Sequence, residues 1–122
     1  MRFFLVGAGG FAGAIARYGV NLWCESFWRR PFPLATFLVN ISGCFILGFF
    51  LAVAAERLPI DPRWRLFVGT GFVGAYTTFS TFEYETQRLT STGALGWAVV
   101  NIVTSIVAGY VAVQLGVMLG RR

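Results

Sequence analysis

Histidine and lysine are both absent from this chain, and charged residues of any kind are scarce. Without histidine, the sequence lacks the commonest general base and the commonest metal ligand. The two cysteines, Cys24 and Cys44, have no metal-ligand spacing and do not form a disulfide framework. No pair of nucleophile and base and no metal-binding cluster can be recognised, so the sequence does not indicate an enzyme.

The scarcity of charge also excludes an ordinary soluble domain. Only 12% of the 122 residues are charged, against about 25% in soluble proteins, and the mean hydropathy is +0.69. The net charge of +5 comes from arginines scattered between apolar segments, which is not the basic patch of a nucleic-acid-binding protein. Since a membrane-spanning helix takes about 20 residues, we expect an all-α integral membrane protein, a single domain of residues 1–122 with spans at about 3–22, 34–55, 64–89 and 94–119.

The first span is rich in small residues. Gly9 and Gly13 form a GxxxG pair, which lets two helices approach closely in a membrane. Arg17, near the end of the span, either reaches the lipid headgroups or makes a structural or functional contact with an anion. Arg2, the apolar run and the small residues at 14–16 also resemble a signal peptide, but cleavage there would remove the small-residue partner of the later spans.

The third span contains the most unusual stretch, GTGFVGAYTTFSTFEYE at residues 69–85. Its glycine-rich first half and its hydroxyl-rich second half meet near Gly74-Ala75-Tyr76, where glycine favours an interruption of the helix. Non-helical backbone at membrane depth survives only where it is buried in protein or lines a cavity. We therefore expect the third helix to be broken near its middle, with freed carbonyls that suit a cation.

Polar and aromatic side chains on three spans are candidates for the lining of one path. Phe79 and Phe82 lie three residues apart and face the same way, and Glu85 continues that line. Asn40 shares a face with Thr36 and forms either a clasp between helices or part of the path, because an unpaired amide in mid-span is costly. The fourth span carries a polar stripe made of Asn101, Thr104 and Ser105.

This lining suits an anion better than a cation. It offers hydroxyl and amide donors and aromatic rings, but no Asp, Glu or Lys in mid-span, whereas cation pathways use carboxylates or rings of carbonyls. The edge of a phenylalanine ring carries a positive partial charge. Narrow walls of phenylalanine favour a small, strongly hydrated anion, which the residues by themselves do not identify.

The arginines divide almost evenly between the two sides of the membrane. With four spans, six of them (Arg2, Arg57, Arg63, Arg65, Arg121, Arg122) lie on one side and four (Arg17, Arg29, Arg30, Arg88) on the other. Because so weak a bias barely specifies an orientation, the chain could insert both ways and form an antiparallel, dual-topology homodimer. A second copy would also help to enclose a pore, since four thin helices enclose little volume.

Three motifs resemble the signatures of the Fluc/CrcB fluoride channels. They are GGFAGAIARY at residues 9–18, TFLVNISGCFILG at 36–48 and GAYTTFSTFEYE at 74–85. The match covers all four spans in order, and TTFSTF is its most specific part. The resemblance implies an antiparallel homodimer of four-helix subunits with two fluoride pores and a sodium ion buried at the dimer centre. It also implies passive export of fluoride from the cytoplasm through the cell membrane.

The same resemblance assigns residues to the fluoride path. Phe79 and Phe82 would meet the ion with their ring edges, and Asn40 would donate its amide to the ion. The hydroxyls of Ser80, Thr81 and Ser105 would line its way. Arg17 would lie near the pore vestibule, and Glu85 would lie toward the pore end.

The resemblance assigns the sodium site to the break. Gly74 and Thr77 of both subunits would offer their backbone carbonyls. Two positions depart from the family pattern: Ala75 stands where a second glycine is usual, which leaves the local geometry open, and Asn101 stands where an aromatic residue or histidine is found, so that it receives no pore role.

Two other functions compete with a fluoride channel. A small dual-topology exporter of the multidrug type would need a membrane-embedded carboxylate in the first span, where this sequence has none. In a non-transporting membrane assembly subunit, the hydroxyl-rich face would only join helices, and mutations there would weaken assembly alone.

Overall fold

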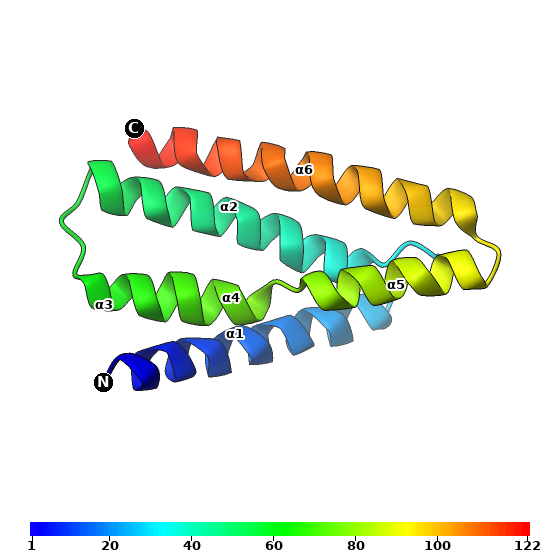
Figure 1. The fold of residues 1–122 in the computed structure, drawn as a ribbon, viewed down its shortest axis with the longest axis horizontal. Helices are drawn as coiled ribbons and strands as arrows, with labels where there is room; N and C mark the ends of the chain where they lie inside the picture. The colour runs from blue at the N-terminus through cyan, green and yellow to red at the C-terminus, as the bar shows by residue number, and fades with distance from the viewer.

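The computed structural model describes all of residues 1–122 and contains only helices and loops (Figure 1). Three helices are long and apolar enough to cross a membrane: α1 (Arg2–Glu25), α2 (Leu34–Glu56) and α6 (Leu95–Arg121). The third of the four spans is assembled from α3 (Pro62–Trp64), η1 (Arg65–Val73), α4 (Gly74–Tyr76) and α5 (Phe79–Ser91). The expected all-α architecture with a broken third span is confirmed.

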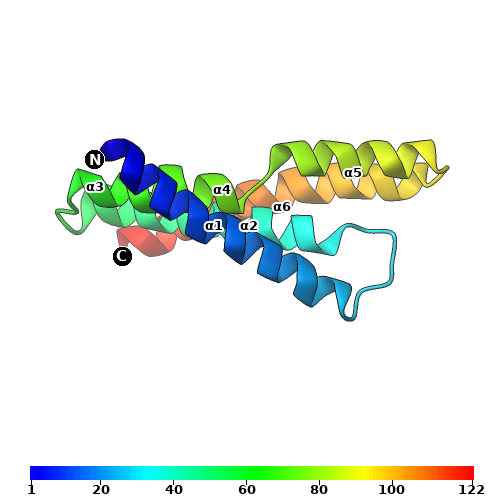
Figure 2. The same cartoon turned by 90° about the horizontal axis from the view of Figure 1, so that it is seen from below.

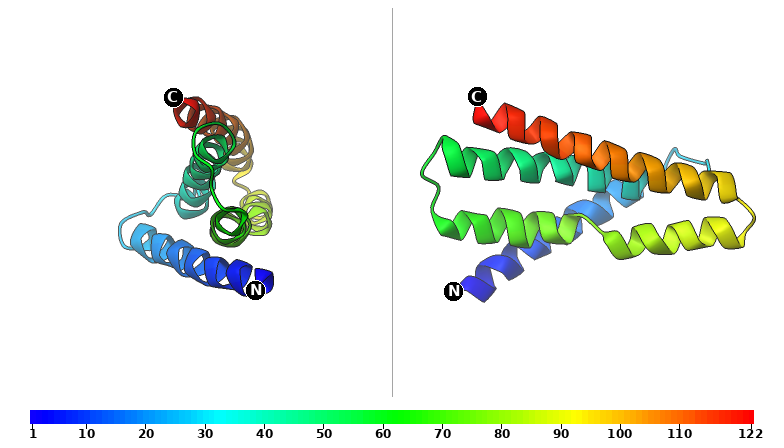
Figure 3. Two further views of the ribbon diagram at one scale, coloured as in Figure 1. Left: turned by 90° about the vertical axis from the view of Figure 1, so that its left-hand side faces the viewer. Right: turned by 45° about the horizontal axis from the view of Figure 1, so that its top comes forward.

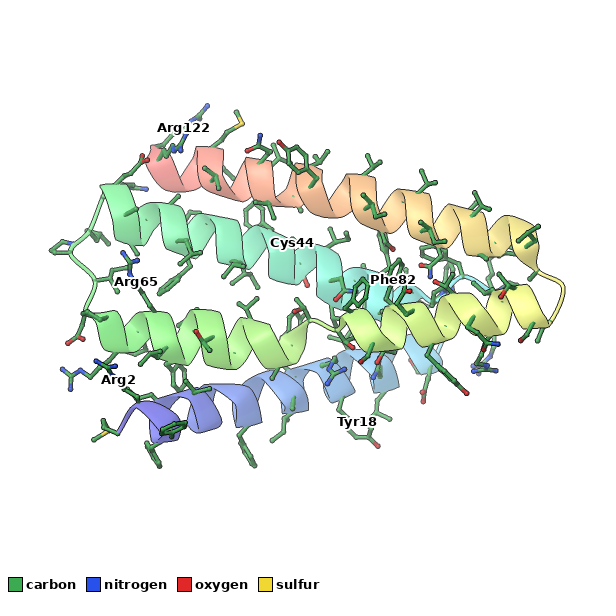
Figure 4. The ribbon with its side chains drawn as sticks, viewed as in Figure 1. Arg2, Tyr18, Cys44, Arg65, Phe82 and Arg122 are labelled. Carbon is green, nitrogen blue, oxygen red and sulfur yellow. The ribbon has the colours of Figure 1, made fainter.

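The four spans run alternately up and down. Both termini and the α2–α3 connection lie at one end, and the α1–α2 loop and the α5–α6 turn lie at the other (Figures 1 and 2). Arg2, Arg65 and Arg122 accordingly all lie toward one end of the molecule, on separate helices (Figure 4). The division of arginines between the two sides therefore follows from the observed topology.

The α2–α3 connection ends in a capped helix start. The Asp61 carboxylate accepts a hydrogen bond from the Arg63 backbone N–H at 2.9 Å and pairs with the Arg63 guanidinium at 2.8 Å. These hydrogen bonds lower the pKa of Asp61. Pro62 follows at the first helical position, where its missing N–H costs nothing. The third span thus begins at a defined residue outside the apolar core.

Glycines allow two close helix contacts. Gly48 of α2 lies against the backbone of α6, where an added Cβ would come within 2.6 Å of the Val113 carbonyl oxygen. On the other side of the bundle α1 crosses the third span at an angle (Figure 3). There a Cβ at Gly9 or Gly13 would overlap the backbone of Phe67 or Phe72, so the GxxxG pair brings α1 against η1 as expected.

The break in the third span lies one turn later than the sequence predicts. Residues 74–76 remain helical, and the interruption falls at Thr77 (φ −86°, ψ 159°) and Thr78 (φ −151°, ψ 118°). Glycine freedom is not needed there, because no residue of the break has a positive φ. Both extended residues are β-branched, which suits this conformation, and the Thr78 hydroxyl caps α5 by accepting the Thr81 N–H at 3.1 Å. Ala75 therefore sits in ordinary helix.

Candidate functional site

A cavity of about 310 Å³ opens beside the break, between α2, α5 and α6. It brings together four of the residues that the sequence nominates for a path: Asn40, Phe79, Phe82 and Ser105. The remaining lining comes from the break itself and from apolar or small neighbours: Gly43, Cys44, Leu47, Val73, Thr77, Thr78 and Ile106. Figure 4 shows Phe82 on the side of α5 that faces α2. The wall therefore combines amide, hydroxyl and aromatic groups without a charge.

Asn40 holds the break in place. Its Nδ2 donates to the Thr78 carbonyl at 3.1 Å, and its Oδ1 accepts the Thr78 N–H at 2.8 Å. The Asn40 side chain thus pairs both the N–H and the C=O of Thr78, which is not in a helix. Backbone groups at this depth in a membrane require such partners. The sequence left Asn40 as either a clasp or part of a path. In the structure it is a clasp that also lines the cavity.

The same clasp frees carbonyl groups on the preceding turn. In an unbroken helix the Gly74 carbonyl would accept the Thr78 N–H and the Thr77 carbonyl would accept the Thr81 N–H. Here the Thr78 N–H donates to Asn40, and the Thr81 N–H donates to the Thr78 hydroxyl. Gly74 and Thr77 therefore present carbonyl oxygens without their helical donors.

The two phenylalanines differ in their surroundings. Their ring centroids lie 6.0 Å apart and the ring planes are tilted by 51°, so the two rings are neighbours, as their spacing of three residues predicts. Phe82 is only 7% exposed, whereas Phe79 is 74% exposed. Phe82 belongs to the core of the subunit, and Phe79 extends from its surface.

A second, larger cavity of about 510 Å³ lies at the end of the bundle that holds the α1–α2 loop. Thr81, Glu85 and Arg88 of α5 face it, as do Trp28 and Arg30 of the loop. Oε1 of Glu85 is buried there without a hydrogen-bond partner. Thr81 and Glu85 therefore face a different cavity from the phenylalanine pair, so Glu85 does not continue the line of the two rings as the sequence predicts.

Two further predicted residues lie outside both cavities. Ser80 is exposed, with its hydroxyl 3.4 Å from that of Thr78. Arg17 follows Gly9 and Gly13 at intervals of four on the face of α1 that packs on the third span, so it is placed near the break. It is half-buried and makes no hydrogen bond or ion pair within the subunit.

Sequence reasoning missed a buried hydrogen-bond chain behind the cavity wall. The Asn101 amide donates to the Thr86 hydroxyl at 2.9 Å, and Thr86 donates to the Phe82 carbonyl at 2.8 Å. Ser105 donates to the Asn101 Oδ1 at 3.3 Å. The spacing of four between Asn101 and Ser105 predicted their shared stripe, but only the fold reveals Thr86 as the partner on α5.

No group of three or more His, Cys, Asp or Glu residues that could bind a metal is present in the subunit. A cation held here would therefore be coordinated by other oxygens, of which the carbonyls at the break are the candidates.

Comparison with known proteins finds one family and several relatives that match nearly the whole chain. The sequence family described as "CrcB-like protein, Camphor Resistance (CrcB)" matches residues 4–117. A protein of Acidobacterium capsulatum named "Fluoride-specific ion channel FluC" is 45% identical over 122 residues, which are 100% of this chain and 98% of that protein. A protein of the same name from Solibacter usitatus is 40% identical, with 100% of both chains covered. "Fluoride-specific ion channel FluC 1" of Listeria innocua is 41% identical, with 98% of both chains covered.

Proposed function

The chain belongs to the CrcB-like family, and from this premise we propose that it is a fluoride-specific ion channel. It is a multi-pass membrane protein and not an enzyme. It lets fluoride leave the cytoplasm down its electrochemical gradient and so lowers the internal concentration of a toxic ion.

The cavity beside the break is the observation that carries this function. Phe82, Asn40 and Ser105 converge on it from α5, α2 and α6, and no charged side chain lines it. Ring edges and hydroxyl or amide donors can replace the water around a small anion. Because the wall holds no fixed positive charge, an ion is bound weakly enough to leave, which conduction requires.

We assign the remaining predicted residues to the approaches of this cavity. Thr81 and Glu85 face the larger cavity at the end of the bundle, and Ser80 lies between them and the break along α5. Arg17 lies on α1 beside the break, where its positive charge would attract an anion. These residues form the polar track and vestibule of the channel.

The functional unit we propose is an antiparallel homodimer. One subunit leaves its phenylalanine pair half-covered, since Phe79 is 74% exposed while Phe82 is buried. A second subunit, inserted the opposite way, would cover Phe79 and complete the wall of each pore. The near-even division of arginines between the two sides permits both orientations in one membrane.

A structural sodium ion at the dimer centre fits the carbonyls at the break. Gly74 and Thr77 have lost their helical donors to Asn40 and Thr78, and unwound carbonyls are known ligands of sodium. Two carbonyls are too few for one cation, so both subunits would contribute. The ion would supply fixed positive charge and hold the two breaks together.

Fluoride flux from liposomes tests the function directly. Purified protein is reconstituted with internal potassium fluoride, and efflux is followed with a fluoride electrode after valinomycin is added. We expect rapid efflux of fluoride and none of chloride in a parallel chloride assay. Absence of fluoride efflux from a folded, dimeric preparation would refute the proposal.

Two alternatives make different predictions in the same assay. A multidrug-type exporter would exchange protons for organic cations, but the only carboxylate of α1 is Glu25, its last residue. A non-transporting assembly subunit would show no flux, and substitutions at Phe79 would then alter assembly alone.

A further inference from the structure

Asn101 is the most deeply buried polar side chain of the subunit, with 1% of its surface exposed. It stands on α6 and faces α5. A buried amide is costly unless its polar atoms are hydrogen-bonded, so its partners indicate what it holds.

Those partners connect two residues of the cavity wall. Asn101 accepts a hydrogen bond from Ser105 at 3.3 Å and donates to Thr86 at 2.9 Å. Thr86 in turn donates to the Phe82 carbonyl at 2.8 Å. Ser105 and Phe82 line the cavity, whereas Asn101 and Thr86 do not. The chain of hydrogen bonds therefore runs behind the wall from one lining residue to the other.

We propose, on the premise that this cavity carries fluoride, that Asn101 is a positioning residue that sets the Ser105 hydroxyl against the Phe82 ring. No other side-chain hydrogen bond joins α5 to α6. Away from the short turn at residues 92–94 that joins them, the two helices would without it be held only by apolar packing, which does not fix their register along each other as a directional bond does.

The geometry at Ser105 adds a contribution to selectivity. Its proton is directed to the Asn101 Oδ1 over a long hydrogen bond of 3.3 Å. An anion in the cavity receives this proton only by displacing Asn101. Fluoride is the stronger hydrogen-bond acceptor and competes for the proton better than chloride does. Asn101 thereby opposes chloride more than it opposes fluoride.

Paired substitutions separate positioning from stability. Removing one partner of a buried hydrogen bond is costly, but replacing both with apolar groups of similar shape can be nearly neutral. The double variant Thr86→Val with Asn101→Leu is therefore expected to keep the dimer and its thermal unfolding close to wild type. Asn101→Leu alone is the second test protein, since Thr86 retains its bond to the Phe82 carbonyl there.

We expect both variants to conduct fluoride about tenfold more slowly, the effect of losing one hydrogen bond, and to reject chloride less well. Ser105→Ala should slow the wild-type protein but have no further effect in the double variant, because both changes act through the same hydroxyl. The matched control is Thr104→Val on the same helix. The Thr104 hydroxyl bonds only the Val100 carbonyl of its own helix, at 2.6 Å, so flux and selectivity should not change.

The positioning role would be refuted if Asn101→Leu and the double variant both conducted fluoride and rejected chloride as the wild type does. Asn101 would then be only a structural clasp. Additive effects of Ser105→Ala in the double variant would refute its action through Ser105. Absence of fluoride flux from the wild-type protein would instead refute the channel function itself, so the two failures are distinguishable.

Discussion

Asn40→Leu tests whether one side chain maintains the break in the third span. Leucine has a similar volume but pairs with neither the N–H nor the C=O of Thr78, which Asn40 contacts at 2.8 and 3.1 Å. Each unpaired buried polar group costs about 1–3 kcal/mol. Because Thr78 is half-buried in the subunit, we expect the lower part of the summed range, a loss of about 2–4 kcal/mol.

This loss should appear first at the break itself. A cost of about 2 kcal/mol raises the population of locally opened protein about 30-fold. Hydrogen–deuterium exchange of a peptide that covers residues 74–82 should therefore accelerate at the Thr78 amide by about that factor or more. The unfolding midpoint in detergent should fall, and fluoride efflux from liposomes should slow.

Ser42→Ala is the matched control. Ser42 lies on the same helix and shares a hydrogen bond of 2.9 Å with the Tyr76 hydroxyl, before the break. Its loss should cost about 1 kcal/mol and leave exchange at Thr78 unchanged. If Asn40→Leu unfolds like the wild type and its Thr78 amide stays as protected, Asn40 does not maintain the break and our reasoning is wrong.

Three further predictions concern packing, the rings and the cation. Gly13→Ala should lower the stability measured by thermal unfolding by about 1–3 kcal/mol, because the added Cβ overlaps the Phe72 backbone. Gly19→Ala, whose Cβ meets open space, should not lower it. Equal effects of the two substitutions would contradict the contact between α1 and η1. Phe82→Ile should lower both the stability of the subunit and the fluoride flux. Phe79→Ile changes a ring at the surface, so it should lower the flux with little loss of subunit stability. Unchanged flux in both variants would exclude the two rings from the path. Exchange of sodium for N-methylglucamine should lower the thermal stability of the dimer; no response would mean that the carbonyls at the break hold no structural sodium.

The three long apolar helices could be predicted from the sequence because hydropathy and length determine them. Apolar runs of sufficient length leave few alternatives in a chain with 12% charged residues. Gly9 and Gly13 predicted a close helix contact for the same reason, since small residues at intervals of four act locally on one helix face; that the partner is the third span only the structure shows. These are properties that neighbouring residues determine without reference to the rest of the fold.

The position of the break could not be predicted in this way. Glycine content pointed to Gly74, but the helix ends where the Thr78 backbone finds a better partner than the preceding turn. That partner is Asn40, 38 residues away, and no local pattern specifies such a contact. The role of Asn101 was missed for the same reason, because Thr86 belongs to another helix.

The break joins the two candidate ion sites physically. On one side of Thr78, the hydrogen bonds to Asn40 form part of the wall of the 310 Å³ cavity. On the other side, the same bonds deprive the Gly74 carbonyl of its helical donor and leave it free for a cation. A change that restored the helix would let the Thr78 N–H return to Gly74. It would therefore remove the Asn40 contact and the cation ligand together, so the anion path and the cation site should be lost as one unit.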